Sequence, residues 1–149
     1  MTNLAFNKRA KYDYEVLKKY EAGIKLSGPE VKSAKLKQIS LKGSYVTLKD
    51  GQGWLLNCHI SPYKKARLEG YDPTRTRKLL LHKKEIDSIL GKLKQRGLTL
   101  IPFRVYTKRG LIKVEFGLCR GKRKYEKREL IKKREAERKI KRALRGKLD

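Results

Sequence analysis

The last 30 residues of the chain are too polar to take part in a hydrophobic core, and this confines the fold to the residues before them. Residues 120–149 contain 15 Lys or Arg and 5 Asp or Glu, a net charge of +10. Few aliphatic residues accompany them, so the segment cannot bury enough apolar surface to offset its loss of conformational entropy on folding. We therefore expect one folded domain over residues 1–119 and a basic tail over residues 120–149 that is disordered in the free protein.

The tail nevertheless carries a weak helical pattern. Three Glu–Lys pairs are spaced four residues apart in the favourable order: Glu129 and Lys133, Glu135 and Lys139, and Glu137 and Lys141. Each pair stabilises a helix by only about 0.2–0.5 kcal/mol, so an isolated helix would be marginal. We expect the tail to become helical when it lies along RNA. The alternative is a solvated basic tail with no defined target.

The folded domain has the pattern of a small β protein. Apolar and polar residues alternate over much of 12–26, and β-favouring residues recur in four further segments, at 44–49, 53–60, 98–106 and 111–118. Asp50-Gly51 joins two of these segments with a sequence typical of a two-residue hairpin turn. Several short strands within about 119 residues favour a mainly β fold, with an OB-fold-like small β-barrel as the natural candidate.

Two helices are expected to flank this barrel. Pro29 suits the first turn of a short helix over residues 30–35. The second helix is indicated by four apolar residues that share one helical face: Ile86, Ile89, Leu90 and Leu93. The stretch 63–77 has the polar composition of a loop.

The charge of the folded domain points to a polyanionic partner. Residues 1–119 contain 26 basic and 10 acidic residues, a net charge of +16, which exceeds what solubility requires. No apolar run reaches the roughly 18 residues of a membrane span, and the N-terminus lacks the pattern of a signal peptide. We therefore expect a cytoplasmic protein with no membrane partner.

The sequence carries no recognisable catalytic or metal-binding motif. Its two cysteines and two histidines lack the spacing of zinc or redox sites. There is no phosphate-binding glycine loop and no nucleophile elbow. We expect no cofactor, no metal, no enzymatic activity, and buried structural thiols at Cys58 and Cys119.

Basic residues and tyrosines interleave near the N-terminus, where we expect RNA contacts from Asn7, Lys8, Arg9 and Tyr12. Cations that hold phosphates and rings that stack on unpaired bases are the usual means of binding looped RNA. The alternative is that the tyrosines belong to the core and the lysines to its solvated rim.

A second candidate is the segment Asp72-Pro73-Thr74-Arg75-Thr76-Arg77-Lys78. Asp-Pro starts a turn, and Arg75, Arg77 and Lys78 then lie close enough together to donate to phosphates. The alternative is a surface loop that only links strands.

Five ordered stretches resemble the SsrA-binding protein (SmpB) family along nearly the whole chain. They are Asn7-Lys8-Arg9-Ala10, Tyr20-Glu21-Ala22-Gly23-Ile24, Gly28-Pro29-Glu30-Val31-Lys32-Ser33, Asp72 through Leu81, and Gly121-Lys122-Arg123-Lys124-Tyr125-Glu126-Lys127-Arg128. The resemblance implies an OB-type barrel, which agrees with the strand pattern. It also implies a bacterial factor that binds transfer-messenger RNA (tmRNA) and delivers it, together with elongation factor Tu, to stalled ribosomes for trans-translation. Elongation factor Tu would be contacted only indirectly, through tmRNA, and the protein is expected to be a monomer.

The resemblance further implies that the barrel holds the tRNA-like domain of tmRNA. By motif match, this RNA face includes Asn7, Glu21, Leu80 and Lys113. The other residues expected to contact tmRNA are Lys8, Arg9, Tyr12, Arg75, Arg77 and Lys78. Leu80 is expected at the surface because three consecutive leucines cannot all face inward on a strand. For Glu21, the alternative to an RNA contact is a structural salt bridge.

The tail is implied to enter the empty mRNA channel of the ribosome, against small-subunit ribosomal RNA. The residues expected at the decoding centre and in the channel are Gly121, Lys122, Arg123, Tyr125, Lys127 and Arg128. The family often shows Asp-Lys-Arg where this chain has Glu126-Lys127-Arg128, which keeps the charge and lengthens the side chain by one methylene.

Two other classes of protein compete with this interpretation. A ribosomal protein or OB-fold translation factor that binds ribosomal RNA shares the size, charge and basic tail but does not account for the ordered motifs. An RNA-modifying enzyme or nuclease would need a catalytic constellation that the sequence does not show.

Overall fold

The computed structural model describes residues 1–66, 69–95, 97–121 and 124–148, and the chain is mainly β with flanking helices. This agrees with the predicted fold class. In chain order the elements are β1 (Thr2–Phe6), α1 (Ala10–Asp13), β2 (Tyr14–Ile24), α2 (Gly28–Lys35), β3 (Ile39–Ser40), β4 (Tyr45–Lys49), β5 (Gln52–Leu56), β6 (His59–Ile60), β7 (Arg77–Leu80), α3 (Lys83–Leu93), β8 (Leu98–Lys108), β9 (Leu111–Gly121) and α4 (Lys124–Leu148).

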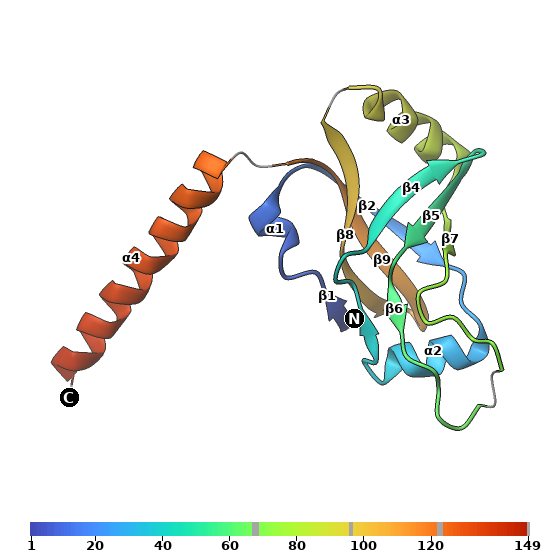
Figure 1. Ribbon diagram of the computed structural model, residues 1–149, viewed down its shortest axis with the longest axis horizontal. Helices are drawn as coiled ribbons and strands as arrows, with labels where there is room; N and C mark the ends of the chain where they lie inside the picture. The colour runs from blue at the N-terminus through green and yellow to red at the C-terminus, as the bar shows by residue number, and fades with distance from the viewer. Residues whose placement is uncertain (67–68, 96, 122–123, 149) are drawn as a thin grey trace.

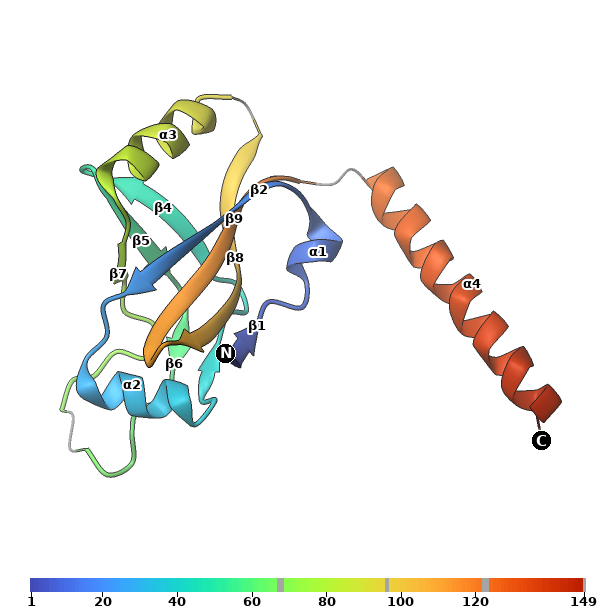
Figure 2. The same ribbon diagram turned by 180° about the vertical axis from the view of Figure 1, so that it is seen from behind.

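The main sheet closes into a ring. Strands β8, β4, β5, β7, β2 and β9 follow one another as antiparallel neighbours, and β9 pairs again with β8. Strand β1 pairs with the second half of β8, where Thr2 lies opposite Thr107 and Phe6 opposite Arg104. Figure 1 shows α2 and α3 at opposite ends of this ring, and Figure 2 shows the same arrangement from behind. The structure therefore contains a closed ring of strands, in agreement with the mainly β fold expected from the strand pattern.

A glycine allows the ring to bend at β9. Gly117 pairs with Lys19 of β2 and with Ile101 of β8, and each of these strands carries a β-bulge nearby. A Cβ atom at Gly117 would lie 2.4 Å from Cε2 of Phe103 and 3.0 Å from the carbonyl oxygen of Lys18. The missing side chain lets the Phe103 ring pack directly against the backbone of β9.

The predicted hairpin and the predicted helices agree with the structure. Asp50 and Gly51 both have positive φ angles, 55° and 69°, as a type I′ turn requires. Helix α2 begins with a capping box in which the Ser27 side chain accepts from the Glu30 amide and the Glu30 side chain accepts from the Ser27 amide. Helix α3 buries Ile86 and Ile89, in line with its predicted apolar face.

Three local features differ from the sequence prediction or were absent from it. The alternation from Tyr12 begins in a short helix, α1, because Ala10 packs into a small cluster with Ile101, Phe103 and Cys119. Strand β1 was not predicted, since residues 2–6 alternate only weakly. The expected loop over residues 63–77 ends one residue earlier, because Arg77 pairs with Leu55 of β5 and begins strand β7.

The tail is helical in the structure. Helix α4 extends away from the closed sheet, with its start near α1 (Figures 1 and 2). A helix here agrees with the Glu–Lys spacing, whereas disorder of the tail in the free protein stays a prediction. None of the helices in the described part of the chain is long and apolar enough to span a membrane.

Candidate nucleic-acid interface

Arg77 is buried and serves the fold rather than a surface. Its side chain is 0% exposed, and its Nε donates to Oε2 of Glu30 at 2.7 Å. Its other nitrogens donate to the carbonyl oxygens of Cys58 at 2.6 Å and of Pro73 at 3.0 Å. The hydroxyl of Tyr71 also accepts from it, at 3.2 Å. The prediction that Arg77 contacts phosphate is therefore wrong, because its donors are all directed into the protein.

Arg75 shares the same carboxylate. Its Nε donates to Oε2 of Glu30 at 3.1 Å, and one terminal nitrogen forms an ion pair with Oε1. Burial would raise the pKa of Glu30, but hydrogen bonds from Arg75, the Ser27 backbone and Arg77 lower it to about 2. Arg75 is 38% exposed, so it can reach solvent only in part. The segment 72–78, which was predicted to bind RNA, therefore mainly connects the start of β7 and the loop before it to helix α2 through Arg75 and Arg77.

Leu80 and Lys113 lie on one outer face of the ring. Gly23 of β2 pairs with Leu80 of β7 on one side and with Lys113 of β9 on the other. Directly paired residues share a face, so the Leu80 and Lys113 side chains lie on either side of Gly23, and Leu80 packs against it. Leu80 is 54% exposed, while Leu79 is buried, as the alternation along a strand requires. We call this the outer face: Glu21, Gly23, Leu80 and Lys113.

Glu21 belongs to a charged network on this outer face. Its carboxylate accepts a hydrogen bond from the Tyr106 hydroxyl and pairs with Nζ of Lys108 at 3.4 Å. The hydrogen bond from Tyr106 lowers the pKa of Glu21, and burial raises the pKa of Tyr106. Arg104 lies 4.3 Å from the Tyr106 ring centroid. Glu21 thus forms the structural salt bridge that was the alternative to an RNA contact. Its side chain is nevertheless 39% exposed and can still accept a hydrogen bond from a ligand.

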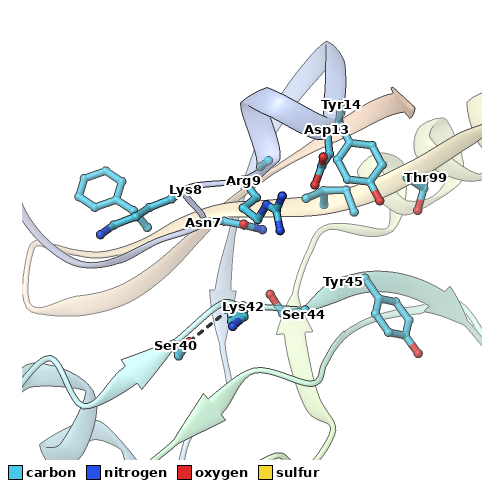
Figure 3. Close-up of a pocket in the computed structure, with 14 residues that line it drawn as sticks. Asn7, Lys8, Arg9, Asp13, Tyr14, Ser40, Lys42, Ser44, Tyr45 and Thr99 are labelled. Carbon is cyan, nitrogen blue, oxygen red and sulfur yellow. Dashed lines mark hydrogen bonds between the residues drawn. The ribbon is translucent and has the colours of Figure 1, made fainter. Parts of the chain in front are cut away.

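Asn7, Lys8 and Arg9 follow β1 and line a groove of about 790 Å³. One wall is formed by residues 6–10, 13 and 14, the other by residues 40 and 42–45, and Thr99 and Ile101 form part of the lining. Figure 3 shows Arg9 extending from the first wall toward the second. Asn7 is half-buried and donates from Nδ2 to the Pro102 carbonyl at 3.0 Å, so part of its role is to anchor this wall.

The second wall brings residues to the groove that the sequence did not suggest. Ser44 donates from its amide and its hydroxyl to the Leu41 carbonyl, and Gly43 has a φ angle of 73°. This tight turn places Lys42 at its tip, with the Lys42 amide donating to Oγ of Ser40 at 3.3 Å (Figure 3). Tyr45 follows and is 40% exposed. The only sequence signal was a Gly-Ser pair ahead of a strand, typical of a turn.

The remaining predicted residues are less informative. The Arg9 guanidinium carbon lies 6.0 Å from the ring centroid of Tyr12, and Lys78 of β7 pairs with Trp54. Gly121 ends β9 opposite Tyr14. Lys122 and Arg123 lie outside the described residues. Tyr125, Lys127 and Arg128 fall on the first turns of α4, and their side chains lie outside the described part of the structure.

The described residues offer no constellation for metal chemistry. Among them, no group of three His, Cys, Asp or Glu side chains could hold a metal ion. Cys58 and Cys119 are buried free thiols, and burial raises the pKa of each to about 11. The expectation of structural thiols agrees with these positions.

Three comparisons place the chain among known proteins. The family model for SmpB protein matches residues 4–146. An SsrA-binding protein from Sulfurihydrogenibium sp. is 54% identical over 145 residues, covering 97% of this chain and 95% of that one. One from Streptococcus mutans is 50% identical over 141 residues, covering 95% and 91%. A solved chain described under "tmRNA-SmpB: a journey to the center of the bacterial ribosome" is 46% identical, with a TM-score of 0.66, covering 85% of this chain and 92% of that one.

Proposed function

The chain belongs to the SmpB protein family, and from that premise we propose that it binds the tRNA-like domain of tmRNA and delivers it to stalled ribosomes for trans-translation. The observation that carries the proposal is the 46% identity, over 85% of this chain, to a chain solved under a description of tmRNA and SmpB in the bacterial ribosome. Elongation factor Tu would be reached only through tmRNA. The protein would act in the cytoplasm as a monomer without enzymatic activity.

The outer face is the part of the ring that we assign to tmRNA. Lys113 supplies a cation for phosphate, and Leu80 presents an exposed apolar surface on which a base can pack. Gly23 between them has no side chain, and the Leu80 side chain packs over it: a Cβ atom at Gly23 would lie 3.3 Å from Cδ1 of Leu80. Glu21 holds Lys108 on the same face and remains able to accept from a base amino group.

The tail is the part that we assign to the ribosome. Residues 120–149 carry a net charge of +10, and the described side chains of α4 at 131–143 are exposed. A helix that projects from the domain with a basic surface can lie along ribosomal RNA in the mRNA channel. Gly121, Lys122, Arg123, Tyr125, Lys127 and Arg128 would lie nearest the decoding centre.

Binding to two RNAs of equal length tests the proposal. Fluorescence anisotropy would compare a labelled tRNA-like domain of tmRNA with a labelled ribosomal RNA fragment at one fixed salt concentration. We expect a clear preference for the tRNA-like domain. Equal affinity would instead support a ribosomal protein or OB-fold translation factor.

Two substitutions then test the outer face. Lys113→Gln and Leu80→Ala should each weaken binding of the tRNA-like domain by about tenfold, the scale of one lost charged or stacking contact. The matched control is Leu36→Ala, because Leu36 is also a 60% exposed leucine and lies at the C-terminal end of α2, outside the outer face. Equal losses in all three variants would contradict the assignment of this face.

A further inference from the structure

We propose that a hollow beside the outer face, lined by Lys25, Trp54 and Lys78, binds one unpaired nucleotide of the tRNA-like domain of tmRNA, with its base on the Trp54 indole and its phosphate between the two lysines. This inference rests on the proposed function and adds a base-stacking site to it. Lys25 and Trp54 lie outside all five stretches that resemble the family, so the resemblance assigns neither of them to RNA.

The three side chains form one row across the ring. Strands β5, β7 and β2 are neighbours there, and Trp54 of β5 pairs with Lys78 of β7 (Figure 2). The amide of Lys25, the residue after β2, donates to the Lys78 carbonyl at 2.9 Å, which continues the pairing of β2 with β7 by one residue. Paired residues share a face of the sheet, and Arg77 and Leu79 on either side of Lys78 are buried. The row therefore faces the outside of the ring.

The row adjoins the outer face. Lys78 and Leu80 are two residues apart on β7, so their side chains point to the same side of the ring, about 7 Å apart along the strand. Lys25 and Gly23 have the same relationship on the neighbouring strand. An RNA strand that packs on Leu80 and continues along β7 therefore reaches the row.

The hollow has the charge that a phosphate requires. Its volume is about 410 Å³, and no carboxylate among the described residues lines it. Lys25 is exposed and Lys78 is half-buried, and within the described part of the chain neither forms an ion pair with a carboxylate. A third cation in the lining, Arg75, is already paired with the buried Glu30. The two lysines are therefore the cations left for a phosphate.

The indole of Trp54 is held in place before any ligand binds. Its Nε1 donates to the Lys49 carbonyl at 3.3 Å, across the hairpin that joins β4 to β5. The ring is partly exposed where it lines the hollow. A ring that is already fixed loses little freedom when a base stacks on it, so less binding free energy is spent on ordering the side chain. Stacking accepts any base, because every base has an aromatic face.

A ring beside two lysines favours a nucleotide over an acidic protein surface. An aspartate or glutamate would pair with the lysines but leave the indole uncovered. A nucleotide supplies a phosphate and an aromatic base in one unit. Bases inside a duplex are stacked on their neighbours, so the base that packs on Trp54 must be unpaired.

Trp54 is the only tryptophan in the chain, so its emission reports on this site alone. The full-length protein is titrated with the tRNA-like domain of tmRNA, with duplex RNA of equal length, and with polyglutamate. We expect the tRNA-like domain to quench the emission, because a stacked base quenches an indole, and the other two ligands to leave it nearly unchanged. Unchanged emission at saturating tRNA-like domain would overturn the inference. Equal quenching by duplex RNA or polyglutamate would also overturn it.

A lysine variant tests the phosphate contact. Lys25→Gln should weaken binding of the tRNA-like domain by about fivefold and reduce the slope of log affinity against log salt concentration by about 1. The matched control is Lys35→Gln, which also removes one positive charge, because Lys35 is an exposed lysine in the last turn of α2 and outside the lining of the hollow. This control should keep both the affinity and the slope of the wild type. Equal effects of the two variants would contradict the phosphate assignment.

Two tryptophan variants test the stacking contact. Trp54→Ala should weaken binding of the tRNA-like domain by about tenfold, as for the loss of one stacked base, whereas Trp54→Phe keeps a ring and should weaken it by less than about threefold. Thermal melting shows which variants keep the fold, and the Lys25→Gln comparison decides the matter if Trp54→Ala does not. A folded Trp54→Ala protein with wild-type affinity would overturn the inference.

The proposed function fails by a different result, namely wild-type protein that does not prefer the tRNA-like domain to ribosomal RNA of equal length.

Discussion

Arg77 and Glu30 form an ion pair inside the protein, with 2.7 Å between Nε and Oε2 and neither side chain more than 1% exposed. They are 47 residues apart in the chain, so the pair joins the start of β7 to the first turn of α2. A buried charge that loses its partner is strongly destabilising, whereas the intact pair costs little to keep once its remaining donors are satisfied.

Glu30→Gln should destabilise the protein by about 3–5 kcal/mol, because Arg77 stays charged and buried without a carboxylate. Urea unfolding followed by circular dichroism measures the change. Lys78→Gln is the control, since Lys78 is the next residue and half-buried without this pair. A loss as small as that of Lys78→Gln would show that the ion pair contributes little.

The same pair predicts a dependence of stability on pH. The pKa of Glu30 falls from 4.5 to about 2 on folding, so the folded state binds this proton less tightly than the unfolded state. The stabilisation of the folded state by the ionised Glu30 carboxylate is complete above about pH 4.5 and is lost as pH falls toward 2. Melting temperatures of wild type and Glu30→Gln should therefore converge between pH 4.5 and pH 2. A constant difference across this range would contradict the assignment.

Gly117→Ala should destabilise the protein by about 1–3 kcal/mol, because the added methyl group would overlap the Phe103 ring and press on the Lys18 carbonyl. Chemical denaturation gives the value. Gly91→Ala is the matched control, because Gly91 lies within α3 and has open space around its Cβ position. This variant should stabilise the protein by up to about 1 kcal/mol. Destabilisation by both variants would mean that packing at Gly117 is not the cause.

Truncation after Gly121 should leave affinity for the tRNA-like domain nearly unchanged and abolish tagging on stalled ribosomes in a reconstituted translation system. The cut keeps all of β9, whose Cys119 is buried against Ala10, so the ring stays intact. Loss of tmRNA affinity on truncation would refute the division of work between domain and tail.

Far-ultraviolet circular dichroism of the full-length and truncated chains tests the state of the tail. The difference spectrum should show little helix for the free protein and more helix when small subunits are bound, because three Glu–Lys pairs leave an isolated helix marginal. A helical difference spectrum of full amplitude without RNA would show that α4 is stable by itself.

The sequence by itself determined those features that depend on neighbours along the chain. Asp50-Gly51 requires a tight turn because both residues take positive φ angles, and the capping box at Ser27 and Glu30 needs only four residues. Residues 120–149 could not join a core because too little of them is apolar. The alternation over 98–118 likewise determined the last hairpin, and five ordered motifs indicated the family.

Only the tertiary structure decided which charged residues face outward. Arg75, Arg77 and Lys78 look equivalent in sequence, yet Arg77 points inward on β7 and meets Glu30 from α2, a contact between segments 47 residues apart. Tertiary packing also brought Lys42 and Tyr45, from a later segment of the chain, into one groove with Arg9. Composition specifies how much charge a chain carries, but pairing between distant strands decides where that charge is presented and what it can bind.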